Sequence, residues 1–289
     1  MGYRRQSLAT EFRLRIKASL LAAAVLALPA HCLAAEPLES PQQLIQDMAY
    51  NEIQDRALQT CWIYHIEHTV DGQTKSEQQV ESVDGPVFRV LAINSRQLTD
   101  TQEKEENARL MHLLANPSEQ RKAKQLHEQD EERLQRLTAL MPKAFLYQFV
   151  GMEGNLIELR FSPNPDFKPP TFEARAFADL AGTLEINASQ KRLVRLDGQL
   201  IHQVDFGLGL LGRIEKGGTF IIERTPVSST HWKTSRVSVH VTGHIIVFKS
   251  ISKQQDERRS DFHPLPEGTT LAQAEALLNQ AGGRDSQGK

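Results

Sequence analysis

The stretch at residues 61–82, CWIYHIEHTVDGQTKSEQQVES, decides the fold class. Large apolar side chains alternate with polar ones from Trp62 to Val70, and this period of two predicts a half-buried β-strand. Asp71-Gly72 then predicts a hairpin turn, because both residue types tolerate the positive φ that such turns require. The stretch therefore predicts an antiparallel sheet.

The same alternation continues through the second half of the chain. From Phe145 onward, short alternating segments recur about every 8–12 residues, with Asn, Asp and Gly between them. This regular spacing predicts a strongly curved antiparallel sheet or a half-open barrel. Its later strands are expected at residues 182–187, 192–197, 199–206, 219–227, 232–242 and 245–252.

Three helical regions are expected to pack against this sheet. SPQQ at residues 40–43 supplies an N-cap serine and a proline at the first helical position. The segment 99–141 is crowded with charges, lacks glycine and predicts two helices that break at Asn116-Pro117. A further helix begins at Thr270. The chain is therefore predicted to be mainly β with packed helices (α+β), with an N-terminal helix and a charged helical insertion.

The first 35 residues have the composition of a secretory signal peptide. A basic start is followed by the apolar run ASLLAAAVLALPA, which is too short to span a bilayer, and by small residues near Ala35. Cleavage near Ala35 predicts an exported chain in the periplasm or envelope of a Gram-negative-type bacterium, with lipid attachment at Cys32 as an alternative. The predicted organisation is a signal peptide at 1–35, one β-rich domain at 36–267 with the insertion 99–141, and a C-terminal helix with a disordered tail at 268–289.

Charge and cysteine content narrow the classes of function. The first 35 residues hold five basic residues and one acidic residue, so the remainder has 29 basic and 35 acidic residues. A net charge near −6 argues against nucleic acid as a partner. Cys61 has no second cysteine in the exported chain, so we expect a small buried residue, with a reactive nucleophile as the alternative. The exported chain holds no long apolar run, so no transmembrane span is expected.

One motif suggests a nucleotide cofactor. DFGLGLLGRIEKGG at residues 205–218 spells G-x-G-x-x-G, the fingerprint of a dinucleotide-binding loop. Such a loop opens a helix, whereas Gly217-Gly218 and an apolar strand follow here, so the glycines indicate bends in a curved sheet. His65 and His68 lie three apart on a predicted strand and point to opposite faces, which argues against a shared metal. We expect no cofactor and no metal.

The order of the elements resembles the periplasmic lipoprotein-carrier superfamily, the proteins with LolA-like folds. The resemblance covers roughly residues 44–252 and rests on the N-terminal helix, the aromatic strand ending in Asp71-Gly72, the antiparallel meander and the packed helices. It implies a half-barrel that holds acyl chains under a helical lid, and it carries over no functional residue. Segments 160–175 and 205–213 also resemble uncharacterised secreted bacterial proteins.

The leading hypothesis is a non-enzymatic exported protein that binds an apolar ligand, a lipid or a lipoprotein acyl chain, in a half-barrel cavity. One alternative is an envelope interaction or scaffold module that contacts a protein through segment 99–141 and has a filled core. Another is a hydrolase that uses carboxylates or His202, which is expected to face the interior. A cavity above about 300 Å³ favours the ligand, and native packing density favours the scaffold. The expected ligand contacts are Trp62, Tyr64, Ile66, Phe149, Leu159, Phe167, Leu200, His202, Val204, Phe206 and Phe248.

Overall fold

The computed structural model describes residues 39–58, 60–70, 72–206, 212–245 and 253–285. The predicted signal peptide, Cys32 and Phe248 lie outside these ranges, as does the end of the predicted C-terminal tail. The described residues from Ser40 onward belong to one folded unit.

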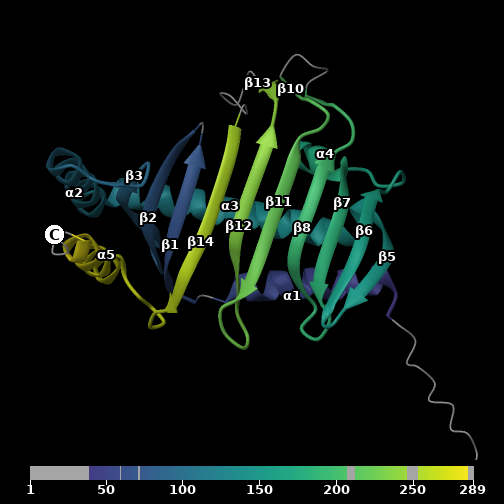
Figure 1. Cartoon of the computed structure of the whole chain (residues 1–289), viewed down its shortest axis with the longest axis horizontal. Coiled ribbons are helices and arrows are strands. Elements are labelled where there is room, and N and C mark those ends of the chain that lie inside the picture. The colour runs from purple at the N-terminus through teal and green to yellow at the C-terminus, as the bar shows by residue number, and fades with distance from the viewer. Residues whose placement is uncertain (1–38, 59, 71, 207–211, 246–252, 286–289) are drawn as a thin grey trace, which may run out of the picture. The chain divides into compact units, whose positions relative to one another are not determined.

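Eleven strands form one antiparallel sheet, in the order β4-β3-β2-β1-β14-β12-β11-β8-β7-β6-β5. The sheet is curved, and it is unclosed because its end strands, β4 and β5, do not pair with each other (Figure 1). The predicted α+β fold with a curved antiparallel sheet and packed helices is confirmed. The strands of this sheet are β1 (Trp62–Val70), β2 (Gln73–Ser82), β3 (Gly85–Ile93), β4 (Arg96–Gln97), β5 (Phe145–Glu153), β6 (Leu156–Pro163), β7 (Leu180–Asn187), β8 (Arg192–Leu200), β11 (Thr219–Pro226), β12 (Trp232–Val241) and β14 (Lys253–Pro264).

A second, three-stranded sheet holds the end of the glycine motif. Its order is β13-β10-β9, from Gly243–Ile245, Gly212–Ile214 and Val204–Phe206. Residues 207–211 lie outside the described ranges, but Gly212 begins β10, and Phe206 pairs with it in an antiparallel ladder. A strand therefore follows the motif where a dinucleotide-binding loop requires a helix.

The first hairpin forms as its sequence predicts. Ile63 pairs with Val80 and Val70 pairs with Gln73, and Gly72 has φ +82° at the turn. Strand β14, in contrast, is not predicted by its sequence, KQQDERRSDFHP, which has no apolar alternation. β14 nevertheless lies inside the sheet, paired with β1 on one side and β12 on the other. The C-terminal strand therefore joins the first hairpin to the later meander.

The predicted helices begin near the residues expected, and a short helix, α4, was not predicted. The backbone N–H of Gln43 donates to the Ser40 hydroxyl over 3.2 Å at the start of α1. Thr99 and Gln102 form a reciprocal capping box on α2. The predicted break at Asn116-Pro117 is confirmed. The helices are α1 (Pro41–Ala57), α2 (Asp100–Ala115), α3 (Pro117–Ala144), α4 (Phe172–Ala178) and α5 (Leu271–Asp285).

Helices α3 and α5 cover opposite faces of the sheet. In β2, Val80 packs in an apolar cluster with α5, whereas Glu81 lines a cavity together with residues of α3. Neighbouring residues of a strand point to opposite faces, so α5 covers one face and α3 the other. Figure 1 shows α3 crossing behind the strands, with α1 along one end of the sheet. The charged insertion thus lies across the sheet.

The main apolar core lies between α1, the end of α3 and strands β5 to β8. Leu159, Leu184 and Leu200 are at most 1 % exposed, and Ile45 and Met48 of α1 are fully buried against them. A smaller core on the other face joins α5 to the first hairpin. It contains Val80, Val87, Leu110, Ala274 and Leu278.

Candidate ligand-binding site

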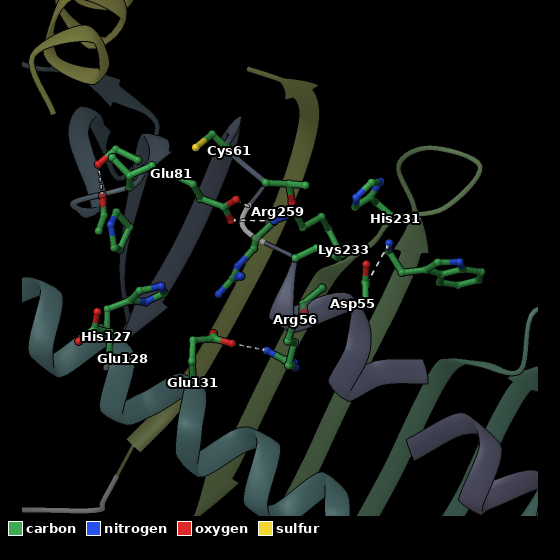
Figure 2. A pocket seen from close by; sticks show the side chains of 18 of the residues that line it. Asp55, Arg56, Cys61, Glu81, His127, Glu128, Glu131, His231, Lys233 and Arg259 are labelled. Atoms are coloured by element: carbon green, nitrogen blue, oxygen red, sulfur yellow. Dashed lines mark hydrogen bonds and ion pairs between the residues drawn. The ribbon is translucent and has the colours of Figure 1, made fainter. Parts of the chain in front are cut away.

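A cavity of about 340 Å³ lies on the α3 side of the sheet (Figure 2). It is formed by the C-terminal end of α1, the middle of α3 and the neighbouring parts of β2, β3, β11, β12 and β14. Nine of its twenty lining residues are charged. The cationic ones are Arg56, Lys124, Arg224, Lys233 and Arg259, and the anionic ones are Asp55, Glu81, Glu128 and Glu131.

Four buried charges close one end of this cavity. Glu52 of α1 accepts from Arg192 Nε at 2.9 Å and from Arg224 Nη1 at 2.6 Å, and it also accepts from the backbone N–H of Leu193 at 3.1 Å. Asp55, one turn later, pairs with both arginines. All four side chains are at most 8 % exposed. Burial costs each charge its hydration, and only the complete set of partners offsets that cost.

The desolvation is evident at Arg224, where burial lowers the pKa of the guanidinium to about 10. Glu52 and Asp55 act against this shift and keep the cation favoured at neutral pH. Its Nη atoms bond to Glu52, to Asp55 and to the carbonyl oxygen of Trp232 at 2.6 Å. The network therefore fixes the end of α1 to β8, β11 and β12.

Polar contacts also hold α3 over the sheet. Arg56 Nη1 donates to Glu131 Oε2 at 2.9 Å, which ties α1 to α3 (Figure 2). Lys124 Nζ donates to the carbonyl oxygen of Val83 at 2.9 Å. Next to it, Gly85 has φ +104°, and an added Cβ would lie 3.4 Å from the Cα of Lys124. Glycine is favoured here because the backbone is left-handed, whereas the added Cβ would touch the helix at an ordinary van der Waals distance.

Two guanidinium donors of residues that line the cavity have no partner. Nε of Arg56 and Nε of Arg224 are buried and make no hydrogen bond to the described part of the chain. Both atoms are covered by protein atoms, so neither is presented to the cavity. What the wall presents to an anionic group is the positive charge of its five Arg and Lys residues, whose side chains suit carboxylate and phosphate oxygens.

Two predicted aromatic residues of β1, Trp62 and Tyr64, contact cations that line the cavity. The ammonium of Lys233 lies 5.6 Å from the Trp62 ring centroid and pairs with Glu81 at 2.7 Å. The guanidinium of Arg259 lies 5.8 Å from the Tyr64 ring centroid. Burial, followed by the charge of Glu81, raises the pKa of Tyr64, so its hydroxyl stays protonated. These contacts hold cations that line the wall, although the rings themselves do not line it.

The other predicted ligand contacts are packed in apolar clusters or are not described by the structure. Leu159, Leu200 and Val204 are buried in the main core, and Phe167 packs against it. Trp62, Tyr64 and Ile66 form their own buried cluster. Phe248 lies outside the described residues, and only the backbone of Phe206 is described. None of the nine predicted residues whose side chains the structure describes lines the cavity.

Two predictions about buried side chains were wrong. His202 does not face the interior: its side chain is 68 % exposed and its Nδ1 lies 3.1 Å from Asp179 Oδ1. The apolar alternation ends before this position, because residues 201–203 lie between two strands. Phe149 lies opposite the buried Leu159 but is itself 49 % exposed, because β5 is the end strand of the sheet.

The residues that form the cavity wall were missed because they come from seven separate elements. Glu52, Asp55 and Arg56 lie close together near the end of α1, but other polar residues along this helix hide the cluster in the sequence. The charge run of α3 gave no indication of which residues face inward. Cys61 is buried as predicted, and it also lines the cavity.

Among the described residues, no group of His, Cys, Asp or Glu side chains is placed to hold a metal ion. Within the same ranges, no helix has the length and apolar character that a membrane crossing requires. No protein-family model matches the chain, and a search of curated proteins finds no significant match.

Proposed function

We propose that this protein is an exported, non-enzymatic binding protein whose ligand is an amphiphile with an anionic group. The anionic group occupies the cavity between α3 and the sheet. The apolar part of the ligand lies at the mouth of the cavity, where Leu58 and Val83 line the wall and are 52 % and 40 % exposed.

The observation that carries this proposal is the charge of the cavity wall, where five Arg and Lys residues stand against four Asp and Glu residues. Glu131 bonds to Nη1 of Arg56, and Glu52 and Asp55 bond to the Nη atoms of Arg224. An anionic group in the cavity would balance the positive charge that remains. A cavity of about 340 Å³ also has the size of small-molecule sites.

The charged wall changes the expected ligand. A bare acyl chain gains nothing from charged walls and would have to desolvate them, which is costly. A lipid or lipoprotein with a charged group near its chain suits the wall and the exposed apolar residues at its mouth. The curved, unclosed sheet with helices across one face also supports the resemblance to LolA-like carriers, which we retain as part of the proposal.

The test is native mass spectrometry of the full chain with an anionic lysophospholipid, and with a neutral alkyl glucoside as the control ligand. We expect one equivalent of the lysophospholipid to bind and the glucoside to bind at least about tenfold more weakly, because a charge-assisted hydrogen bond contributes about 1.5–3 kcal/mol. Arg56→Gln should remove most of this preference. Arg136→Gln is the matched control, since Arg136 lies on α3 in an exposed pair with Glu132, outside the cavity.

Equal binding of the two amphiphiles, or equal binding by the two variants, would contradict the proposal. A scaffold with a filled core predicts that neither amphiphile binds at all.

A further inference from the structure

A second cavity, of about 360 Å³, lies next to the first. It is formed by the end of α1, the turn between β7 and β8, and the loop between β11 and β12. Three of its nine lining residues, Asp55, Leu58 and Trp232, also line the first cavity. The two cavities are therefore neighbours, and one ligand can extend from the first toward the second.

The lining of the second cavity is polar but has no net charge. Its two charged residues, Asp55 and Arg192, form an ion pair with each other, and their side chains are 6 % and 8 % exposed. Five of the other seven lining residues carry an amide or a hydroxyl, and the remaining two, Leu58 and Trp232, are apolar. The first cavity, with its nine charged residues, suits an anionic group, whereas the second suits a part of the ligand that is polar and uncharged.

Hydrogen bonds between separate elements hold this wall in place. Asn51 Nδ2 of α1 donates to the carbonyl oxygens of Gln190 at 3.2 Å and Lys191 at 3.3 Å. Gln190 Nε2 donates to the carbonyl oxygen of Ser229 at 3.2 Å, and its Oε1 accepts from Trp232 Nε1 at 2.8 Å. These bonds join α1 to both connecting segments, so the cavity is pre-formed, as small-molecule sites usually are.

Three polar groups at this wall keep their capacity for further hydrogen bonds. Asn51 Oδ1, the Gln54 amide and the Ser229 hydroxyl make no hydrogen bond to another residue in the part of the chain that the structure describes. An amide and a hydroxyl each offer both a donor and an acceptor. A ligand hydroxyl also donates and accepts, so several hydroxyls on one rigid frame match this set of groups.

We propose that the second cavity binds a polyhydroxy ring, of the sugar or cyclitol type, attached beside the anionic group of the same ligand. Its hydroxyls bond to Asn51, Gln54 and Ser229, and the C–H groups of the ring pack against Leu58 and Trp232. This assignment rests on the proposed function, since the anionic group in the first cavity brings the ring to the second. The ligand is then an anionic amphiphile with a polyhydroxy headgroup.

The test compares lysophosphatidylinositol with lysophosphatidylglycerol of the same acyl chain by native mass spectrometry of the full chain. The two lipids have the same charge, but only lysophosphatidylinositol carries a polyhydroxy ring. We expect it to bind at least about tenfold more tightly, because the ring makes several neutral hydrogen bonds that the shorter glycerol group does not reach.

The double variant Gln54→Ala with Ser229→Ala should remove most of this preference and leave the affinity for lysophosphatidylglycerol unchanged. Both side chains are exposed, and both line the second cavity and not the first. Gln46→Ala is the matched control, because Gln46 is also an exposed glutamine of α1 but lines neither cavity.

Equal binding of the two lysophospholipids by the wild type would overturn the polyhydroxy site and leave the proposed function standing. A preference that the double variant keeps, or a loss that it shows equally for both lipids, would overturn the site as well. Free myo-inositol should not add to the lysophosphatidylglycerol complex, and a ternary complex would contradict a headgroup as the occupant. Binding of neither lipid would overturn the proposed function itself, and the second site with it.

Discussion

The sheet face beneath α1 and α3 divides into two halves with opposite chemistry. Over β5 to β8 the space is filled by leucine, isoleucine, methionine and phenylalanine side chains. Over β2, β12 and β14 the same helices meet charged side chains arranged around a cavity. The contrast indicates that the filled half supplies the cohesion of the helix layer, while the charged half contains the cavity in which we propose that a ligand binds.

The boundary between the halves lies on α1. Met48 is fully buried in the apolar core, and Glu52, one turn later, is buried in the network with Arg192 and Arg224. The ion pairs of Glu52 and Asp55 with Arg192 and Arg224 therefore lie between the core and the cavity. They also fix the position of α1 on the sheet. Each half can be weakened on its own by substitution.

The largest loss of stability is expected at the boundary. Glu52→Ala leaves two buried arginines with one carboxylate between them, and breaking a buried ion pair in this way costs about 3–5 kcal/mol. Denaturant titration of the variant and the wild type measures this loss as a difference in the free energy of unfolding. Glu52→Leu combined with Arg224→Met keeps the Asp55–Arg192 pair and should cost less than Glu52→Ala. A larger loss in the double variant would show that charge balance does not govern this site.

In the filled half, Leu184→Ala should cost about 3 kcal/mol, because Leu184 is 1 % exposed and its removal leaves a cavity in the core. Denaturant titration also measures this loss of stability. Binding of the anionic lysophospholipid by the folded fraction should not change. If Leu184→Ala abolished binding in protein that is still folded, the two halves would not be independent.

At the edge of the charged half, Gly85→Ala should cost about 1–2 kcal/mol, because alanine is strained at φ +104°. Gly72→Ala is the matched control. Gly72 also has positive φ, at +82°, and an added Cβ there meets nothing within 4 Å. At Gly85 the added Cβ would lie at an ordinary contact distance from α3, so thermal unfolding should show similar losses in the two variants. A much larger loss at Gly85 would mean that α3 lies too close to the strand to admit a Cβ.

The smallest effect concerns Glu77 of β2, where desolvation raises the pKa of the carboxyl above its usual value. The folded state then holds this proton more tightly than the unfolded state, so stability falls as pH rises from the unfolded pKa through the folded one. Glu77→Gln mimics the neutral form and should stabilise the protein slightly at pH 7. The gain should vanish below about pH 4, where the carboxyl is protonated in both states. A gain that persists in acid would have another cause.

The contrast between the halves also explains what the sequence could predict. Where the inward face is apolar, as at Leu159 and Leu184, alternation reveals both the strand and its buried side. β14 turns Glu257 and Arg259 toward the charged half, so its inward face has no apolar signature and the strand could not be recognised. The predicted binding residues were chosen for apolar character, which is why they mark the core.

The cavity itself depends on contacts distant in sequence. Arg56 and Glu131 are 75 residues apart, and Glu81 and Lys233 are 152 apart. No local sequence pattern predicts these contacts. The distance between β2 and β12 is set by β14, which pairs with β1 on one side and with β12 on the other. The caps at Ser40 and Thr99, in contrast, are local and were predictable.

The most direct test of the central claim is hydrogen exchange of the full chain with and without bound anionic lysophospholipid. Binding in the charged half predicts slower exchange at residues 124–131 of α3 and in β12 and β14, with unchanged exchange in β5 to β8. Slower exchange confined to β5 to β8, or no change anywhere in a chain that has bound the ligand, would contradict the account.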